Sequence, residues 1–151
     1  NLSCLAKLLE KRNQIDEAIS QLTNRPAQTG RLGEFVAEDI FNIDLHEDRS
    51  HPGSDGIFGS GDLKGKSVNI KWYTVRKGII SLSRDQPRPD YYLMMTGPKT
   101  YGNSEGRSYP LIISSVYLFD SKRLFQDLES RDLPIGNPTS VRLALWNEAE
   151  N

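Results

Sequence analysis

The sequence predicts one α/β domain of 151 residues, in which helices flank a β-sheet and an extra long helix comes first. Three observations predict it. Apolar residues recur at helical spacing near the N-terminus, and short β-branched and aromatic runs follow in the middle of the chain. No run of glycine, proline or serine divides the chain, so residues 1–151 are expected to form a single domain.

The first helix is predicted over residues 2–23, because leucines and isoleucines recur on one stripe with charged residues elsewhere. The run Asn24-Arg25-Pro26 ends it. We expect this segment, residues 1–25, to serve as a packing helix or a dimer contact. A homodimer through the N-terminal helix is therefore one expected assembly.

Three further helices are predicted from periodicity and caps, over residues 29–41, about 120–131 and within 138–151. In the first of them, Gly33 would let the helix approach a sheet closely. Asp120 or Ser121 is expected to cap the second, and Thr139 or Ser140 the last.

Strands are expected at about 54–58, 67–75, 79–82, 91–96 and 111–119. The last run is nearly continuous in apolar residues, which is typical of a strand buried on both faces. Residues 43–61, which include the first of these strands, are otherwise expected to be turn-rich.

The bulk composition excludes several classes. A single cysteine, Cys4, excludes a disulfide framework within the chain and argues against a cysteine-based zinc site. His46 and His51 lie in a polar stretch without helical spacing, so we interpret them as solvated loop residues. No run reaches transmembrane length and no signal peptide is visible, so no membrane partner is expected and the cytoplasm is the default location.

Net charge is −1, so no overall basicity indicates nucleic acid, but residues 63–84 carry lysines and arginines and no acidic residue. Such a local basic block suits a nucleic-acid surface. A glycine- and proline-containing loop at 97–110 adds two more cations. The expected phosphate contacts are Lys64, Lys66, Arg76, Lys77, Lys99 and Arg107.

The strongest chemical signal is Asp55 followed by Asn69 and Lys71. Positions 69 and 71 are two apart in a β-branched run, so a strand would turn both side chains to one face. Asp55 on a neighbouring strand could meet them there, with Glu34 of the second helix as a fourth member. Oxygen ligands beside a lysine suit metal-assisted phosphodiester cleavage. An ordinary ion pair between Asp55 and Lys71 is the alternative interpretation.

Two other motifs carry less weight. The run Gly61-Asp62-Leu63-Lys64-Gly65-Lys66-Ser67 is similar to a phosphate-binding loop, but its first glycine position is Ser60 and a strand follows where a helix is required. We interpret it as a hairpin turn. Pro89-Asp90 is a literal Pro-Asp pair, but the lysine downstream of it, Lys99, lies outside any strand, so Asp90 is interpreted as a residue that starts a strand.

Over residues 29–130 the chain resembles the restriction-endonuclease-like nucleases, whose signature is Pro-Asp, then Asp/Glu-x-Lys, often with a glutamate on the preceding helix. Asp55 matches the aspartate, with Pro52 three residues earlier instead of adjacent. Asn69 stands in the Asp/Glu place and Lys71 in the lysine place. Glu34 is similar to the helical glutamate.

This resemblance implies an α-β-β-β-α-β core with a central mixed sheet, and Mg²⁺ or Mn²⁺ held by Asp55, Asn69 and Glu34. It implies a metal-dependent endonuclease that hydrolyses phosphodiester bonds in DNA, with a type II restriction endonuclease as one form. Asn69 keeps an oxygen but lacks the charge, which predicts weaker metal binding. A catalytically inactive nucleic-acid-binding or interaction module on the same fold is the alternative, and a scaffold built on the first helix is a third interpretation.

Overall fold

A five-stranded mixed sheet forms the centre of the computed structural model, which describes residues 1–48, 50–98 and 111–150. The strand order is β1-β2-β3-β5-β6, and a second, two-stranded sheet joins β4 to β7. The strands are β1 (Ile43–Leu45), β2 (Gly56–Phe58), β3 (Ser67–Tyr73), β4 (Ile79–Ile80), β5 (Tyr91–Thr96), β6 (Ser115–Asp120) and β7 (Thr139–Ser140). In the larger sheet β3 and β5 are parallel and the other neighbours are antiparallel. The predicted α/β class with a central mixed sheet is confirmed.

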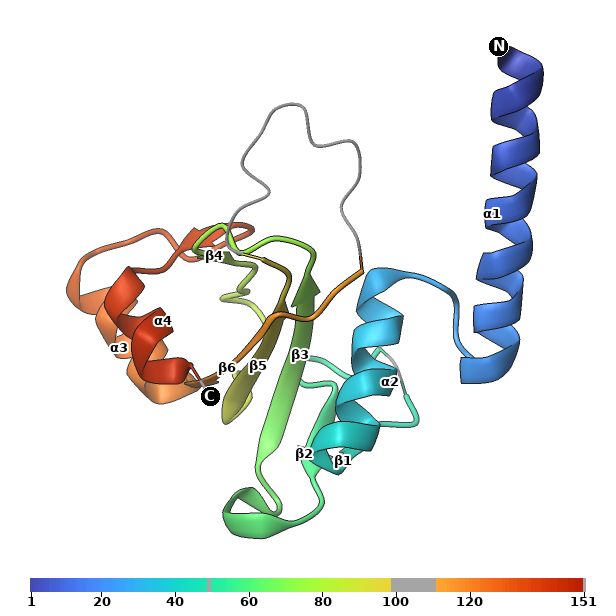
Figure 1. The fold of residues 1–151 in the computed structure, drawn as a ribbon. Coiled ribbons are helices and arrows are strands. Elements are labelled where there is room, and N and C mark those ends of the chain that lie inside the picture. The colour runs from blue at the N-terminus through green and yellow to red at the C-terminus, as the bar shows by residue number, and fades with distance from the viewer. Residues whose placement is uncertain (49, 99–110, 151) are drawn as a thin grey trace.

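Helices cover both faces of this sheet, and a further long helix extends from the body (Figure 1). α2 (Thr29–Phe41) covers one face, while α3 (Ser121–Ser130) and α4 (Leu143–Ala149) lie on the other. α1 (Leu2–Thr23) has no buried residue. A 3₁₀ turn, η1 (Gly61–Leu63), lies in the connection from β2 to β3, where the sequence predicts a hairpin turn.

Alternation along β3 separates its apolar and polar side chains. Val68 and Ile70 are buried in the cluster that contains Ala37 of α2. Asn69 and Lys71 point to the opposite face, because side chains alternate along a strand. There Lys71 pairs in register with Met94 of β5, a member of the cluster under α3 and α4. One face of β3 thus builds core, and the other carries Asn69 and Lys71.

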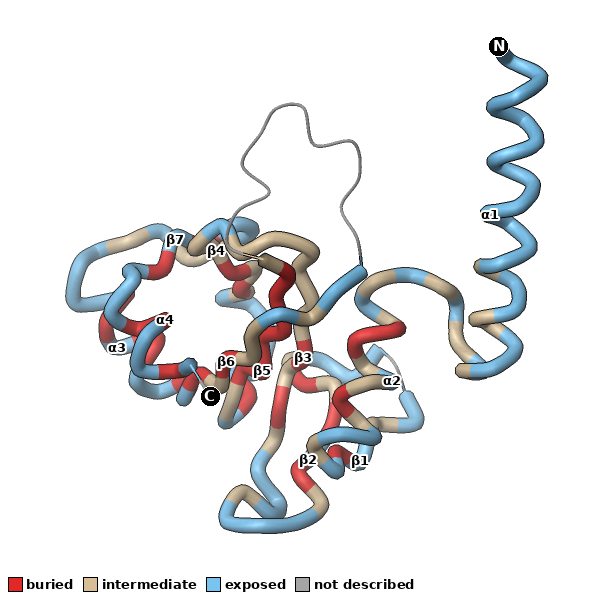
Figure 2. Tube along the Cα trace, in the orientation of Figure 1, coloured by how far each residue is buried: buried red, intermediate tan, exposed pale blue. Residues whose placement is uncertain are grey.

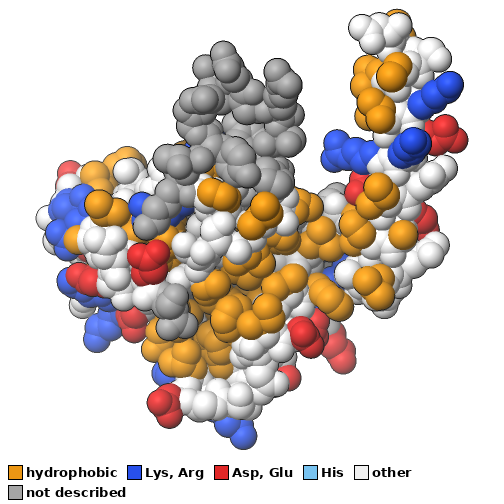
Figure 3. Space-filling view, in the orientation of Figure 1, with side chains coloured by type: hydrophobic (Ala, Val, Ile, Leu, Met, Phe, Trp, Pro, Cys, Tyr) orange, Lys and Arg blue, Asp and Glu red, His pale blue; other side chains and the backbone are white. Residues whose placement is uncertain are grey.

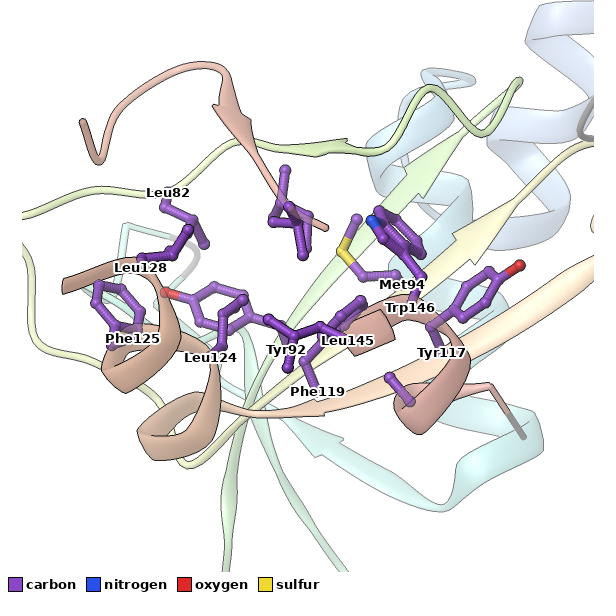
Figure 4. Packing of buried hydrophobic residues seen from close by; sticks show 13 residues of the cluster. Leu82, Tyr92, Met94, Tyr117, Phe119, Leu124, Phe125, Leu128, Leu145 and Trp146 are labelled. Carbon is purple, nitrogen blue, oxygen red and sulfur yellow. The ribbon is translucent and has the colours of Figure 1, made fainter. Parts of the chain in front are cut away.

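The larger hydrophobic cluster lies between the sheet and the two C-terminal helices (Figures 2 and 4). Trp146 of α4 is at its centre, with 1 % of its surface exposed. Its ring meets Tyr117 and Phe119 of β6 edge-on, at centroid distances of 4.8 and 5.0 Å. Such edge-to-face contacts are favourable arrangements of aromatic rings, so α4 is fixed to the sheet by its tryptophan.

Several predicted boundaries are confirmed. α1 and α2 have the expected ranges, and α1 ends at Asn24, whose φ of 50° is left-handed. The Asp120 carboxylate caps α3 by accepting a hydrogen bond from the backbone N–H of Arg123 at 2.9 Å. Capping side chains compensate backbone N–H groups that the first helical turn leaves unpaired.

Other boundaries were predicted wrongly. Thr139 and Ser140 do not cap the last helix but form β7, and α4 starts at Leu143. The run 111–119 was expected to be one strand, yet β6 begins at Ser115, because Leu111 and Ile112 lie outside the sheet and are about half exposed. β1 occurs where turns were expected. Three residues are too few for a period-2 pattern to be visible in sequence.

Asp90 joins the starts of β3 and β5. Its Oδ2 accepts hydrogen bonds from the backbone N–H and the hydroxyl of Ser67, both at 2.9 Å. The Ser67 hydroxyl in turn contacts the backbone N–H of Asp90. These bonds, the backbone N–H of Ser67 first, hold the pKa of the Asp90 carboxyl below its ordinary value. The Pro-Asp pair therefore starts a strand, as predicted.

The close approach of α2 to the sheet can be tested at Gly33. A Cβ there would lie 3.0 Å from the Trp72 Cβ and 3.4 Å from the Met95 Cε, whereas a Cβ at Gly30 would meet nothing within 4 Å. We expect Gly33→Leu to lower the free energy of unfolding by about 1–3 kcal/mol through overpacking, and Gly30→Leu to change it little. Urea denaturation of both variants measures the difference. Equal effects would contradict the close packing.

Candidate functional site

Asp55 is held at the point where β2 begins to pair with β3. Its backbone N–H donates to the Val68 carbonyl at 2.9 Å, and its own carbonyl accepts from the His46 N–H at 3.0 Å. The carboxylate Oδ2 accepts a 2.6 Å hydrogen bond from the backbone N–H of Ile70. Next to β2, the Ile70 N–H thus donates to a side-chain carboxylate where a regular sheet would offer a backbone carbonyl. This hydrogen bond holds the charged group of Asp55 beside β3.

The charges of Lys71 and of this carboxylate act on each other without a hydrogen bond or ion pair between them. Burial raises the pKa of Asp55, while the Ile70 N–H and the charge of Lys71 lower it and the charge of Glu34 raises it. Burial likewise lowers the pKa of Lys71, and the charge of Asp55 raises it. Each of these two half-buried groups therefore favours the ionised form of the other.

Asn69 lies on β3 between Val68 and Ile70, the two residues whose backbone groups bond to Asp55. The Asn69 Nδ2 donates to the Gly53 carbonyl at 3.5 Å, whereas its Oδ1 is buried and has no partner in the described part of the chain. Buried polar atoms without partners are rare and costly. This oxygen is therefore available to a ligand.

Glu34 is close enough to raise the pKa of Asp55, but its carboxylate already has partners. Arg31 Nη1 lies 3.0 Å from both carboxylate oxygens, and Arg25 Nη1 lies 3.3 Å from Oε2. Arg25 also pairs with Glu38 at 2.9 Å. A cation at Glu34 would compete with two arginines. The residue is better explained as an anchor for the start of α2.

The candidate residues line two separate hollows. Asn69 and Lys71 line one of about 330 Å³, together with the polar residues Ser81, Ser83, Gln86 and Asn137. Asp55 and Glu34 line another of about 10 Å³, which has room for one water molecule. Asp55 thus lines the hollow beside Glu34 of α2 and not the hollow that contains Lys71.

A third hollow of about 500 Å³ lies at the far end of β3. Its walls include Trp72, Tyr73 and Lys77. It shares Ser81 and Asn137 with the hollow around Lys71, and the Ser81 hydroxyl donates to Asn137 Oδ1 at 2.6 Å. The two hollows therefore lie side by side, with this hydrogen-bonded pair between them. No sequence pattern indicated Asn137, which is 68 positions from Asn69.

The basic residues do not form one patch. Lys64 and Lys66 lie in the turn before β3, and Lys66 pairs with Asp90 at 3.4 Å. Arg76 and Lys77 follow the other end of β3, roughly 20 Å away at about 3.3 Å per residue. The Arg76 guanidinium lies over the rings of Trp146 and Tyr117, at 5.6 and 5.9 Å. Lys99 and Arg107 lie outside the described residues.

A histidine pair was missed by sequence reasoning. The rings of His46 and His51 stack with centroids 4.0 Å apart, and nitrogens of both contact the hydroxyl of buried Ser54, at 3.0 and 3.4 Å. His51 is exposed, as expected, but His46 is half-buried and lines the small hollow beside Asp55. Spacing of five residues across a turn gave no indication of this stack.

The hydrogen bond to Ile70 and the charge of Asp55 can be separated by mutation. Because burial raises its pKa above the ordinary 3.8, the carboxyl contributes stability fully below pH 3.8 and loses it as the pH rises through the raised pKa. Asn keeps an acceptor oxygen and has no charge. We expect Asp55→Asn to melt above the wild type at pH 7, with a difference that shrinks towards pH 3.

The matched variant Asp55→Ala removes the acceptor as well, leaving the Ile70 N–H unpaired at a cost of about 1–3 kcal/mol. Calorimetry on the three proteins across this pH range measures both effects. A melting temperature of Asp55→Asn below that of the wild type at pH 7 would contradict this expectation. It would show that the neighbours of the ionised carboxylate stabilise it by more than its burial costs.

Comparison with known proteins adds no assignment: no protein-family model matches the sequence, and no curated protein is significantly similar to it. Within residues 1–48, 50–98 and 111–150, no three His, Cys, Asp or Glu side chains are grouped to hold a metal ion. No helix in that same part of the chain is both long and apolar enough to cross a bilayer. The function is therefore inferred from the geometry around Asp55.

Proposed function

We propose that the chain is a metal-dependent endonuclease-like protein that hydrolyses phosphodiester bonds in DNA, on a restriction-endonuclease-like core formed by α2 and the strands β2 to β6. A type II restriction endonuclease is one form this activity would take, and a homodimer would suit symmetric cutting of a duplex. The observation that carries the proposal is the polar hollow that Lys71 and Asn69, with its unpartnered oxygen, line on β3, where the Ile70 N–H holds the Asp55 carboxylate.

The oxygen donors suit Mg²⁺ or Mn²⁺. Asp55 offers one carboxylate, which also bonds to the Ile70 N–H, and Asn69 offers one buried amide oxygen from the neighbouring position of β3. Mg²⁺ is often bound through one or two protein carboxylates together with substrate phosphates and water. When bound, the ion would polarise a phosphoryl oxygen and lower the pKa of a water molecule. Glu34 would not bind the ion, because its oxygens contact Arg25 and Arg31. It would influence Asp55 only through its charge.

Lys71 supplies the fixed positive charge. Lys71 lines the 330 Å³ hollow, where a phosphate would enter, and the charge of Asp55 favours its ionised form. The Ser83 hydroxyl and the amide N–H groups of Asn137 line the same hollow and can donate to phosphate oxygens. A preorganised cation in a partly desolvated site stabilises the charge that develops on the phosphorane.

The adjoining 500 Å³ hollow extends the path for a polynucleotide. Trp72 and Tyr73 offer ring surface, and exposed Lys77 offers a phosphate contact. Stacking on aromatic rings and cationic contacts to the backbone are the usual ways of holding a strand without reading its sequence. A strand crossing the Ser81–Asn137 pair would reach both hollows.

Binding without cleavage is the second candidate function, and two observations favour it. Asn69 has no negative charge, and both oxygens of Glu34 are engaged by arginines. The site would then hold a divalent ion weakly, because hard cations prefer anionic oxygen ligands. The hollows and Lys77 would still accommodate a nucleic acid.

Cleavage of plasmid DNA with Mg²⁺ or Mn²⁺ separates the two functions. We expect Asp55→Asn and Lys71→Met each to lower the cleavage rate by about 100-fold or more, because each removes a charge that acts on the transition state. Lys122→Ala, at an exposed lysine on α3, is the matched control and should cut like the wild type.

Asn69→Asp adds the missing charge and should bind Mn²⁺ about tenfold more tightly, which calorimetric titration measures. Cleavage that survives both Asp55→Asn and Lys71→Met would reject this site. DNA binding by a wild type that never cuts would support the binding module.

A further inference from the structure

α1 is a 22-residue helix without a tertiary partner in the described structure. None of its residues is buried, and Figure 3 shows hydrophobic side chains along its length. Leu2 and Leu22 are each 82 % exposed, and Ile15 is 60 % exposed. Helices gain most of their stability in water from packing of an apolar face. Packing of the apolar face of α1 against another surface would therefore stabilise the helix.

The apolar residues follow a heptad repeat. Positions a and d are occupied in order by Leu5, Leu8, Arg12, Ile15, Ile19 and Leu22. Five of these six residues are Leu or Ile, over nearly three heptads, which is the pattern of a two-stranded seam. A single charged residue at an a position is a known device that fixes register at a cost in stability. Arg12 takes that place.

Charges beside the seam select the orientation. In a parallel pair, position g of one helix faces position e of the next heptad on the other, which here joins Lys11 to the partner's Asp16. Asp16 also pairs with Arg12 of its own helix, with Nε and Oδ2 3.7 Å apart. An antiparallel pair with matched ends would instead set Leu9 against the partner's Asp16 and Lys11 against the partner's Ala18, without opposite charges.

We propose that α1 pairs with α1 of a second copy of this chain as a parallel, in-register, two-stranded coiled coil. Asn24 and the Arg25 pairs with Glu34 and Glu38 fix the end of α1 to α2. A parallel pair therefore brings both α/β bodies to the same end of the coil. If the proposed nuclease function holds, the two sites would then face one duplex, but the pairing itself does not depend on that activity.

Cysteine crosslinking of the full chain tests the orientation. In a Cys4→Ser background, which removes the one native cysteine, Leu8→Cys places a thiol at a d position, where parallel partners meet. Glu10→Cys places it on the outer face as a matched control. We expect mild oxidation to give a disulfide dimer with Leu8→Cys and little with Glu10→Cys. Sedimentation equilibrium of the wild type should give the mass of a dimer.

Three outcomes would overturn the proposal. A wild type that is monomeric at every concentration, or larger than a dimer, would reject the two-stranded coil. Crosslinking of Leu8→Cys only when it is mixed with Ile19→Cys would show an antiparallel pair. Circular dichroism of each variant confirms folding, which these exposed substitutions should preserve because α1 has no buried residue.

The charge pattern gives a second test. Lys11→Glu sets like charges against each other and should weaken dimerisation by roughly three- to tenfold at low salt. Adding Asp16→Lys to it restores opposite charges across the seam and should recover most of that loss. The differences should fade as salt screens them. Equal dissociation constants for all three proteins at low salt would contradict the parallel register.

Discussion

The 2.6 Å hydrogen bond from the Ile70 N–H to the Asp55 carboxylate is the contact on which the candidate site depends. It allows β2 to stop pairing with β3 without leaving an edge N–H unpaired. In doing so it holds a carboxylate in partly buried surroundings that disfavour its charge. Lys71 then offsets part of that penalty, while its own burial disfavours its ammonium.

The two faces of β3 have different roles. Val68 and Ile70 are buried against α2, so the strand cannot shift its register by one residue without exposing them. The same register keeps Asn69 and Lys71 on the other face, beside the polar hollow. Stability of the core thus fixes the position of the chemistry.

Charge also connects the body to α1. Arg25 follows the left-handed residue Asn24 and contacts both Glu34 and Glu38, so the chain reversal between α1 and α2 is held by ion pairs that are only partly exposed. Glu34 was predicted as a metal ligand from its place on the helix. In the structure Arg25 and Arg31 surround it, and its negative charge acts on Asp55 through space.

The sequence by itself determined the elements that rest on local periodicity and caps. α1, α2, the alternation in β3 and the Asp120 cap are all visible there, because each depends on neighbours in the chain. That Asp55 and Lys71 act together in one site stays a prediction. β7 was invisible because Thr139 and Ser140 form a strand only by pairing with β4.

Tertiary structure alone decided which groups Asp55 contacts. The backbone N–H of Ile70, the two arginines on Glu34 and the stacked pair His46 and His51 come together through chain reversals that leave no periodic pattern. Asn137 likewise reaches the hollow beside Lys71 from a distant turn. Local spacing constrains which face a side chain takes, whereas packing of the sheet and helices selects its partners.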